Sequence, residues 1–265
     1  MIKRKQYEKT NKYLLLTKKT IFIFLYGKIA VITGGSRGIG REIGNALAAE
    51  GALVVLVARS VNGLKDSKTM IETAGGNAET IPTDLRDRNQ IEKLVSQVVN
   101  KFGGADIIVN VAGVWHDDKI VFAGVPIVDT PADQIDEVLD VGIRAPMHLT
   151  RELLPNMIQR KQGKIISISG TFANGGAGWL HYYVSKLALE HFTVGLAQEL
   201  REHEIQVNCI SPSDTDTEPL RKFFPDDAKS AINPAEVAKL AVFLASEDSD
   251  HITGQCIVIK NKRTH

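Results

Sequence analysis

Apolar residues occur along this chain in two alternating patterns, short continuous runs and longer stretches with helical spacing. Continuous runs predict buried strands, and apolar residues three or four positions apart predict helices that bury one face. The predicted strands lie at 28–33, 52–58, 77–83, 106–110, 163–169, 205–211 and 255–260. The predicted helices lie at 38–50, 61–74, 87–102, 131–160, 180–202 and 234–246.

The order of these elements predicts a doubly wound α/β fold. Apolar strands joined by helices imply a parallel sheet covered on both faces, here a Rossmann fold with seven parallel strands. With 265 residues, of which 43% are apolar, the chain is long enough to bury one sizeable core. We therefore expect a single domain over residues 28–265.

The helix expected at 131–160 carries its own start and interruption signals. Thr130 is a natural N-cap, Pro131 suits the first helical position and Asp133 can complete a capping box. Because proline removes a backbone donor, Pro146 and Pro155 are expected to kink or divide this helix.

Residues 1–27 differ in composition from the rest of the chain. They carry seven Lys or Arg residues and one acid, Glu8, and their apolar patches are too short for a signal peptide or a membrane span. We expect a disordered basic extension and no membrane partner, with an organelle presequence as the alternative.

Charge and cysteine content narrow the class of protein. A formal net charge of +1 gives no support for a nucleic-acid partner. Cys209 and Cys256 lie inside apolar runs, where a small buried thiol is the expected state, and such thiols favour a reducing compartment. We therefore expect a cytoplasmic protein.

A glycine-rich segment, TGGSRGIG at 33–40, stands between the first predicted strand and helix. Gly34 permits a tight turn, Gly38 lets the backbone approach a phosphate and Gly40 allows close helix packing. The helix N-terminus then offers N–H groups and a partial positive charge to a pyrophosphate. A purely structural turn is the alternative, but this context favours a dinucleotide site.

The end of the second predicted strand bears on the choice of dinucleotide. NAD-preferring sheets carry an acid there that holds the ribose 2′-hydroxyl, whereas this chain has Arg59. Arg37 in the glycine-rich segment supplies a second guanidinium, and two such groups suit a 2′-phosphate. The sequence predicts a preference for NADP(H), with NAD(H) possible; solvated surface charges are the alternative.

Tyr182 and Lys186 stand one helical turn apart in HYYVSK. At this spacing two side chains share one face of a helix. The lysine ammonium then favours the phenolate and lowers the tyrosine pKa from about 10. A phenol tuned in this way can exchange a proton with a carbonyl oxygen.

Taken together, these motifs resemble those of the classical short-chain dehydrogenase/reductase family, and within it the 3-oxoacyl reductases. The resemblance covers residues 28 to about 259, with TGGSRGIG matching the family's TGxxxGxG and HYYVSK containing its YxxxK. Further matches are the adenine-contacting pair Asp84 and Leu85, the segment NVAG from Asn110 to Gly113, and SPSDTDT, where Pro212 and Thr217 conform and Ser213 replaces a glycine.

The resemblance implies an enzyme that moves hydride between NADP(H) and a carbonyl compound or secondary alcohol without a metal. Tyr182 is then the acid/base, and Lys186 binds the nicotinamide ribose and tunes the tyrosine. Family members usually form dimers or tetramers, so a homo-oligomer is expected. The residues expected to contact the cofactor are Gly34, Ser36, Arg37, Gly38, Ile39, Gly40, Arg59, Asp84, Leu85, Asn110, Ala112, Gly113, Tyr182, Lys186, Pro212, Thr215 and Thr217.

A catalytic serine that hydrogen-bonds the substrate oxygen is also implied by the resemblance. Spacing back from Tyr182 selects Ser169, whereas alignment along the strand GKIISIS places Gly170 at the serine position. Ser167 is a further alternative, but strand alternation gives it the same facing two residues deeper, where a structural hydroxyl is expected. Ser169 is our candidate.

The clearest departure from the family pattern is Gly142, in EVLDVGIRAPMHL. The family carries there an asparagine that helps fix a water linked to the lysine, and glycine also favours an irregular helix. Gly142→Asn is therefore expected to raise kcat modestly. This departure supports a rival hypothesis, a cofactor-binding protein with weak or lost catalysis that acts as a sensor or interaction module.

Two segments on the carboxyl side of the predicted sheet are candidates for the substrate pocket. Trp179 precedes the tyrosine and is expected to wall the pocket, although it can instead pack the helix entry. The long stretch 214–232, with Phe223 and Phe224, fits a mobile substrate lid or an ordinary surface excursion. The loop holding Trp115 and His116 is expected to be solvated.

Overall fold

The computed structural model describes residues 24–172 and 175–261. The expected N-terminal extension lies outside the described residues except for its last four. In those four, the Leu25 side chain is buried in the core and its N–H donates to the Glu50 carbonyl over 2.9 Å. The last part of the extension therefore packs on the domain.

One seven-stranded sheet forms the centre of the molecule, in the order β3-β2-β1-β4-β5-β6-β7. Every pair of neighbouring strands is parallel, which confirms the predicted doubly wound fold. The strands are β1 Ile29–Thr33, β2 Leu53–Ala58, β3 Asn77–Pro82, β4 Ile107–Asn110, β5 Gly163–Ile168, β6 Ile205–Pro212 and β7 Cys256–Ile259.

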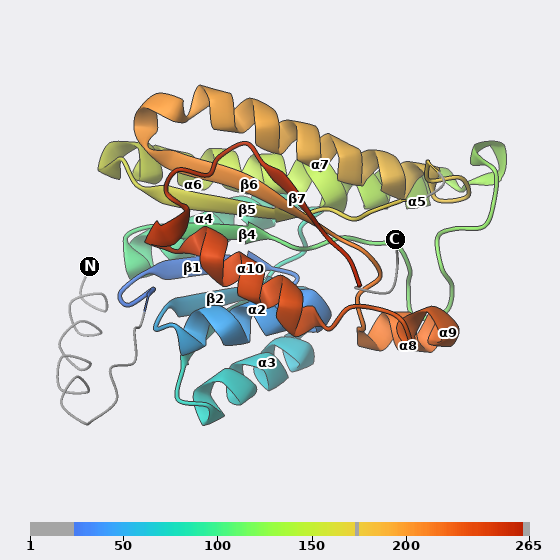
Figure 1. The fold of residues 1–265 in the computed structure, drawn as a ribbon, viewed down its shortest axis with the longest axis horizontal. Helices are drawn as coiled ribbons and strands as arrows, with labels where there is room; N and C mark the ends of the chain where they lie inside the picture. Colours follow the sequence, from blue (N-terminus) through green and yellow to red (C-terminus); the bar gives the residue numbers. More distant parts are fainter. Residues whose placement is uncertain (1–23, 173–174, 262–265) are drawn as a thin grey trace.

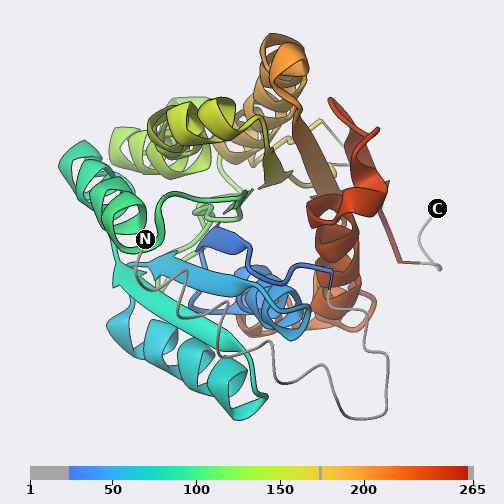
Figure 2. The same ribbon diagram turned by 90° about the vertical axis from the view of Figure 1, so that its left-hand side faces the viewer.

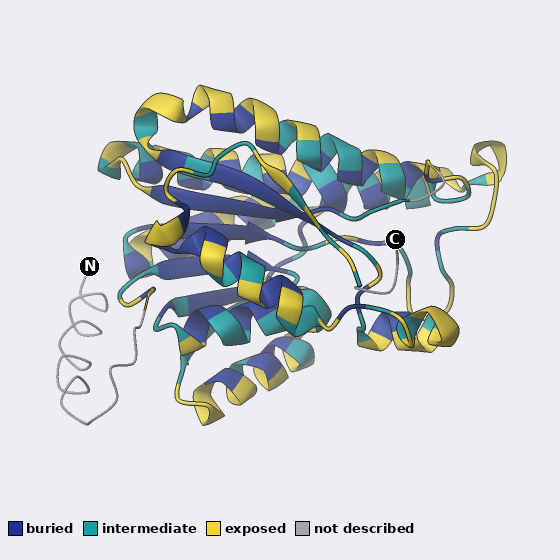
Figure 3. Cartoon of the chain, viewed as in Figure 1, coloured by how far each residue is buried: buried dark blue, intermediate teal, exposed yellow. Residues whose placement is uncertain are grey.

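Helices cover both faces of the sheet, as Figures 1 and 2 show. α2, α3 and α10 pack on one apolar core, and α4, α6 and α7 pack on the other. Figure 3 shows the five inner strands buried between these two layers, whereas the edge strands β3 and β7 are partly exposed. The helices are α2 Gly38–Ala49, α3 Val61–Thr73, α4 Arg88–Phe102, α5 Ala132–Leu139, α6 Ala145–Arg160, α7 Leu180–Glu199, α8 Glu218–Phe223, α9 Pro225–Ala228 and α10 Pro234–Ala245.

The helix expected at 131–160 is divided by a π-helical segment, Asp140–Arg144, between α5 and α6. Pro146 stands in the first turn of α6, directly after the π-helical segment, and Pro155 lies inside a continuous α6. The predicted capping box is wrong. Pro131 occupies the N-cap, and the Thr130 hydroxyl donates to the Pro126 carbonyl over 3.1 Å, because a 3₁₀ turn precedes α5.

The expectation of two buried thiols holds for one of them. Cys209 is buried in β6, whereas Cys256 is exposed. The two residues are paired in register across β6 and β7, and β7 forms the edge of the sheet. The apolar run that contains Cys256 therefore belongs to an edge strand with one open side. No helix of the described part of the chain is long and apolar enough to cross a membrane.

Gly142 lies in the π-helical segment, which confirms the irregular backbone expected there. A Cβ at this position would lie 2.9 Å from both the Cβ and the Oγ of Ser185 on α7. The Ser185 hydroxyl in turn donates to the Tyr182 carbonyl over 2.7 Å. An asparagine at position 142 therefore has no free space, and the gain in kcat expected from the sequence gives way to an expected loss of stability.

We predict that Gly142→Ala lowers the free energy of unfolding by about 1–3 kcal/mol, because the added methyl overpacks the contact between the π-helical segment and α7. Gly195→Ala is the matched control. Gly195 is exposed on α7, no described atom lies within 4 Å of its added Cβ, and the change should stabilise by roughly 0.5–1 kcal/mol. Urea unfolding measures both; effects of the same sign would contradict the assignment.

Candidate active site

A cavity of ≈ 660 Å³ opens at the carboxyl ends of the central strands. The strand order reverses between β1 and β4, and ligands of open parallel sheets bind at such a switch point. The cavity brings together most of the residues expected from the sequence: Gly34, Ser36, Arg37, Gly38, Ile39, Gly40, Arg59, Asp84, Leu85, Ala112, Gly113, Ser169, Tyr182, Lys186 and Thr217.

Three expected cofactor residues, Asn110, Pro212 and Thr215, do not line this cavity. The Pro212 carbonyl accepts the N–H of Thr171 over 3.1 Å, and the Thr215 hydroxyl donates to the Ser213 carbonyl over 2.9 Å. Asn110 ends β4 and is buried, and its side-chain amide has no partner among the described residues. Because a buried unpaired amide costs about 1–3 kcal/mol, Asn110 fits a position that a bound group or water satisfies.

Glycines in the glycine-rich turn allow close contacts that a side chain would block. Gly38 has a φ of 54°, and a Cβ there would lie 3.1 Å from the Thr217 methyl group. A Cβ on Gly40 would lie 2.3 Å from the Gly34 carbonyl oxygen. The first turn of α2 therefore sits directly on the turn, and its N-terminus lies at the cavity. These residues fit a dinucleotide pyrophosphate.

Two guanidiniums predicted to hold a 2′-phosphate lie in the wall of the same cavity. Arg37 Nη2 lies 3.3 Å from His116 Nε2, and Arg59 Nη1 lies 3.1 Å from Glu137 Oε1. The Arg59 side chain is 54% exposed, so it has room to turn towards a bound anion. Both residues are positioned by long-range contacts from the part of the chain after β4.

Asp84 is engaged by a neighbour that the sequence reasoning missed. Arg86 Nε lies 3.0 Å from Asp84 Oδ1 and 3.1 Å from Oδ2, and Arg86 Nη1 lies 3.2 Å from Glu137 Oε1. Hydrogen bonding from Arg86 holds the pKa of Asp84 below its usual value. Arg86, two residues after Asp84, therefore links the segment after β3 to α5 through Glu137.

Tyr182 and Lys186 lie within one turn of α7, with Lys186 Nζ 5.5 Å from the centre of the tyrosine ring. Lys186 is buried, and its Nζ donates to the Ile168 carbonyl at the end of β5 over 2.8 Å. A Cβ on Gly113 would lie 3.2 Å from the same Nζ. The ends of β4 and β5 and one turn of α7 therefore meet at the ammonium group.

Burial shifts the proton affinity of both side chains. It lowers the pKa of Lys186 to about 8 and raises the pKa of Tyr182. The expectation that Lys186 pulls the tyrosine pKa below 10 is therefore wrong. Desolvation of the phenolate is the dominant effect there, because apolar atoms and rings surround the phenol.

Ser169 lines the cavity, but its hydroxyl is directed to α7. Its Oγ donates to Glu190 Oε1 over 2.7 Å and lies 3.2 Å from the Lys186 carbonyl oxygen. A hydroxyl has one proton, and here Glu190 accepts it. The catalytic role of Ser169 stays a prediction.

The two alternatives to Ser169 are also placed by the structure. Gly170 has room for a side chain, because an added Cβ would lie 3.8 Å from Phe172 Cε2 and 4.0 Å from the Pro212 oxygen. Ser167 is buried in β5, and its hydroxyl has no partner among the described residues. Position 170 thus offers space without a hydroxyl, and position 167 offers a hydroxyl without access to the cavity wall.

Residues 28–228 match the family model described as short chain dehydrogenase. The chain belongs to the short-chain dehydrogenase family. It is 30% identical over 246 residues to the 3-oxoacyl-(acyl-carrier-protein) reductase FabG of Thermotoga maritima, covering 89% of this chain and 97% of that relative. The predicted family is confirmed, and the protein is an NAD(P)-dependent oxidoreductase.

Solved structures agree with this assignment. A metagenomic short-chain oxidoreductase in complex with NADP superposes with a TM-score of 0.78 at 32% identity, covering 91% of this dehydrogenase and 99% of that chain. A solved structure from Beutenbergia cavernae is described as a putative NAD(P) dependent gluconate 5-dehydrogenase with NADP bound at low occupancy. It superposes with a TM-score of 0.81 at 27% identity, covering 91% of this chain and 98% of that chain.

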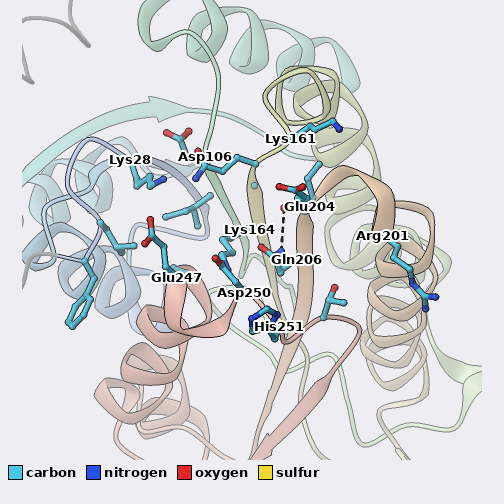
Figure 4. A pocket seen from close by; sticks show the side chains of 18 residues that line it. Lys28, Asp106, Lys161, Lys164, Arg201, Glu204, Gln206, Glu247, Asp250 and His251 are labelled. Atoms are coloured by element: carbon cyan, nitrogen blue, oxygen red, sulfur yellow. Dashed lines mark hydrogen bonds and ion pairs between the residues drawn. The ribbon is translucent and has the colours of Figure 1, made fainter.

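A second cavity of ≈ 430 Å³ lies at the opposite, amino-terminal edge of the sheet in this dehydrogenase (Figure 4). Its lining carries equal numbers of acidic and basic residues, four of each. Lys164 Nζ lies 2.6 Å from Asp250 Oδ1, and Asp106 is bonded to Arg160 and to the Ile29 N–H. This cavity lacks the glycine turn and the Tyr182–Lys186 pair, so the carboxyl edge is the candidate active site of the dehydrogenase.

The shifted pKa of Lys186 makes a prediction about the stability of the dehydrogenase. The folded-state pKa of about 8 lies below the ordinary value of 10.5. Between these values the unfolded chain binds more protons, so the free energy of unfolding rises with pH, by roughly 3 kcal/mol over the full interval. We expect this rise from about pH 8 to 9.5 in urea titrations.

Lys186→Met is the control for that measurement, because it removes the titrating group and keeps an unbranched side chain. Its free energy of unfolding should change much less with pH over the same range. Parallel pH profiles for the two proteins would show that another group is responsible.

Proposed function

We propose that this dehydrogenase catalyses the reversible reduction of a small carbonyl compound to a secondary alcohol with NADP(H). One observation carries the proposal: Tyr182 and Lys186 line the same cavity as the glycine-rich turn at the start of α2. A proton donor and a dinucleotide cradle thus share one site. The rival hypothesis, a sensor or interaction module with lost catalysis, is not favoured.

The residues of the chain have distinct roles in this proposal. The bound nicotinamide supplies or accepts the hydride. The Tyr182 hydroxyl gives its proton to the substrate oxygen during reduction. The Lys186 ammonium, still charged at neutral pH, lies beside the phenol and favours its ionised form once the proton has left. The N-terminus of α2 would hold the pyrophosphate of the cofactor.

Ser169 is our candidate for the group that polarises the substrate oxygen. To act in this way its hydroxyl must leave Glu190 Oε1, which it contacts over 2.7 Å in the structure. Rotation about one side-chain bond is sufficient for such a change of partner.

The contacts of Arg37 and Arg59 support a preference for NADP(H). Both guanidiniums line the cavity, and neither is locked by a buried ion pair, since Arg37 contacts a histidine and Arg59 is largely exposed. A 2′-phosphate can form ion pairs with both guanidiniums, whereas a neutral 2′-hydroxyl can accept only weaker hydrogen bonds from them.

We expect NADPH to bind more tightly than NADH by roughly 1–3 kcal/mol. Arg59→Ala should weaken NADPH binding about tenfold and leave NADH binding nearly unchanged. Arg88→Ala is the control, because Arg88 is exposed on α4, pairs with Glu92 and does not line the cavity. Quenching of protein fluorescence measures the affinity of each protein for both cofactors, six values in all; equal losses for both cofactors on Arg59→Ala would refute the assignment.

Two adjacent tyrosines give a direct test of the proposed acid/base. Tyr182→Phe removes the hydroxyl at the cavity and should lower kcat by about 10²–10⁴-fold with little change in NADPH affinity. Tyr183→Phe keeps the aromatic ring, whose centre lies 5.0 Å from the centre of the Phe172 ring, and should retain most activity. Turnover is followed by NADPH absorbance. A larger loss from Tyr183→Phe would overturn the role of Tyr182.

We also propose a homo-dimer or homo-tetramer that works in the cytoplasm. Exposed apolar side chains on α7, such as Val184 at 47% and Val194 at 41%, support a partner surface along this helix.

A further inference from the structure

Four aromatic residues gather beside Tyr182 and are here called the aromatic wall: Trp115, Trp179, Phe223 and Phe224. Ring centres lie 6.1 Å apart for Trp115 and Phe224, and 6.0 Å apart for Trp179 and Phe224. Trp115 lies 6.1 Å from Trp179 and 6.1 Å from Phe223. Trp179 in turn lies 6.1 Å from the ring of Tyr182. The wall therefore forms one contact network that ends on the proposed proton donor.

The wall is assembled from three separate segments. Trp115 comes from the connection after β4, Trp179 from the connection before α7, and Phe223 and Phe224 from the end of α8. All four rings are only partly buried, unlike the residues of the two main cores. Large aromatic side chains that keep open area beside a reactive group are typical of ligand pockets.

A hydrogen bond holds the α8 part of the wall in place. Lys222 Nζ donates to the Asp118 carbonyl over 2.6 Å, and the same ammonium lies 4.9 Å from the centre of the Phe223 ring. Phe223 also lies 5.1 Å from the ring of His116. The predicted lid segment is thus tied to the loop after β4, so the two aromatic contributions act as one surface.

The charges around the wall disfavour anions. The connections 111–131 and 213–233 together contain eight Asp or Glu residues and four Lys or Arg residues. Two of these bases are paired within the connections, Arg221 with Asp216 and Lys229 with Asp226. The third connection, 169–179, contains no charged residue. Glu218 of these connections pairs with Arg41 of α2 over 3.1 Å, and the connections themselves keep a net negative charge. An anionic substrate or carrier therefore gains no attraction from the two connections that supply Trp115, Phe223 and Phe224.

We infer that the substrate is an uncharged ketone whose carbonyl is attached to, or part of, a flat ring, and that the aromatic wall binds this ring. The inference rests on the proposed function. In the reaction the carbonyl carbon gains hydride as NADPH becomes NADP⁺, and the carbonyl oxygen takes the Tyr182 proton, which solvent replaces. The inference separates this dehydrogenase from relatives named for acyl-carrier thioesters, because those substrates are flexible and anionic.

The test compares two ketones with the same number of carbon atoms. The full chain is assayed with NADPH on acetophenone and on 2-octanone, with acetoacetyl-CoA as the thioester. Stacking on the wall should give acetophenone a kcat/KM about tenfold or more above that of 2-octanone. A preference for 2-octanone or for the thioester would overturn the inference while leaving the proposed oxidoreductase function intact.

Charge selection is tested with a second matched pair, 4-acetylbenzoate and its methyl ester. The ester should have the higher kcat/KM, and the difference should shrink as salt screens the acidic mouth. Equal values at low salt would remove the charge argument.

Variants of the wall connect these preferences to the structure. Trp115→Leu and Phe224→Leu should each reduce the ratio of kcat/KM for acetophenone to that for 2-octanone several-fold. Phe243→Leu is the control, because Phe243 is 38% exposed on α10 and outside the wall. An unchanged preference in both wall variants would overturn the role of these rings.

Binding without turnover separates the inference from the proposed function. Saturation-transfer NMR on Tyr182→Phe with NADP⁺ should show acetophenone, and not 2-octanone, in contact with aromatic protons of the protein. If no carbonyl compound is reduced but this contact is present, the proposed function fails and the ring site stands. If neither ketone shows the contact, the ring site is wrong.

Discussion

The buried ammonium of Lys186 is the contact on which the site depends. Removing a charge from water is costly, and burial lowers the pKa of this lysine to about 8. A 2.8 Å hydrogen bond to the Ile168 carbonyl offsets part of this free-energy cost and also links α7 to the end of β5. The position of Tyr182 on the same helix follows from that link. The Lys186 side chain therefore affects both the packing of α7 on the sheet and the environment of Tyr182.

The sheet explains why this contact falls at the cofactor cavity. Parallel strands carry their carboxyl ends to one edge, and the reversal of strand order between β1 and β4 leaves an opening there. Gly113 follows β4 and approaches Lys186 Nζ so closely that an added Cβ would lie 3.2 Å away. A side chain at this position would therefore press on the ammonium group and require it to move by a few tenths of an ångström.

Much of this arrangement can be predicted from local patterns. Strand β6, expected at 205–211, spans Ile205–Pro212, because continuous apolar runs between turn residues specify buried strands well. For the π-helical segment 140–144, the sequence contains only one signal, Gly142. The change to i→i+5 hydrogen bonds depends on how α7 packs against this segment, which local patterns do not contain. The prediction of Thr130 as an N-cap was wrong for a similar reason, because its hydroxyl donates to the Pro126 carbonyl in the preceding turn.

Contacts between distant segments were the least predictable part of the site. Glu137 joins Arg59 and Arg86 although 78 and 51 residues separate it from them, and no periodic pattern encodes such a meeting. The direction of the Ser169 side chain could not be predicted either. Side chains alternate between the two faces of a sheet only within a strand, and β5 ends at Ile168. The aromatic wall is also a product of three connections brought together. These connections lie outside the two cores, but Trp179 brings the wall to within 6.1 Å of the Tyr182 ring centre. In the proposed function, the rings that select the substrate and the lysine that acts on the phenol therefore meet at one tyrosine.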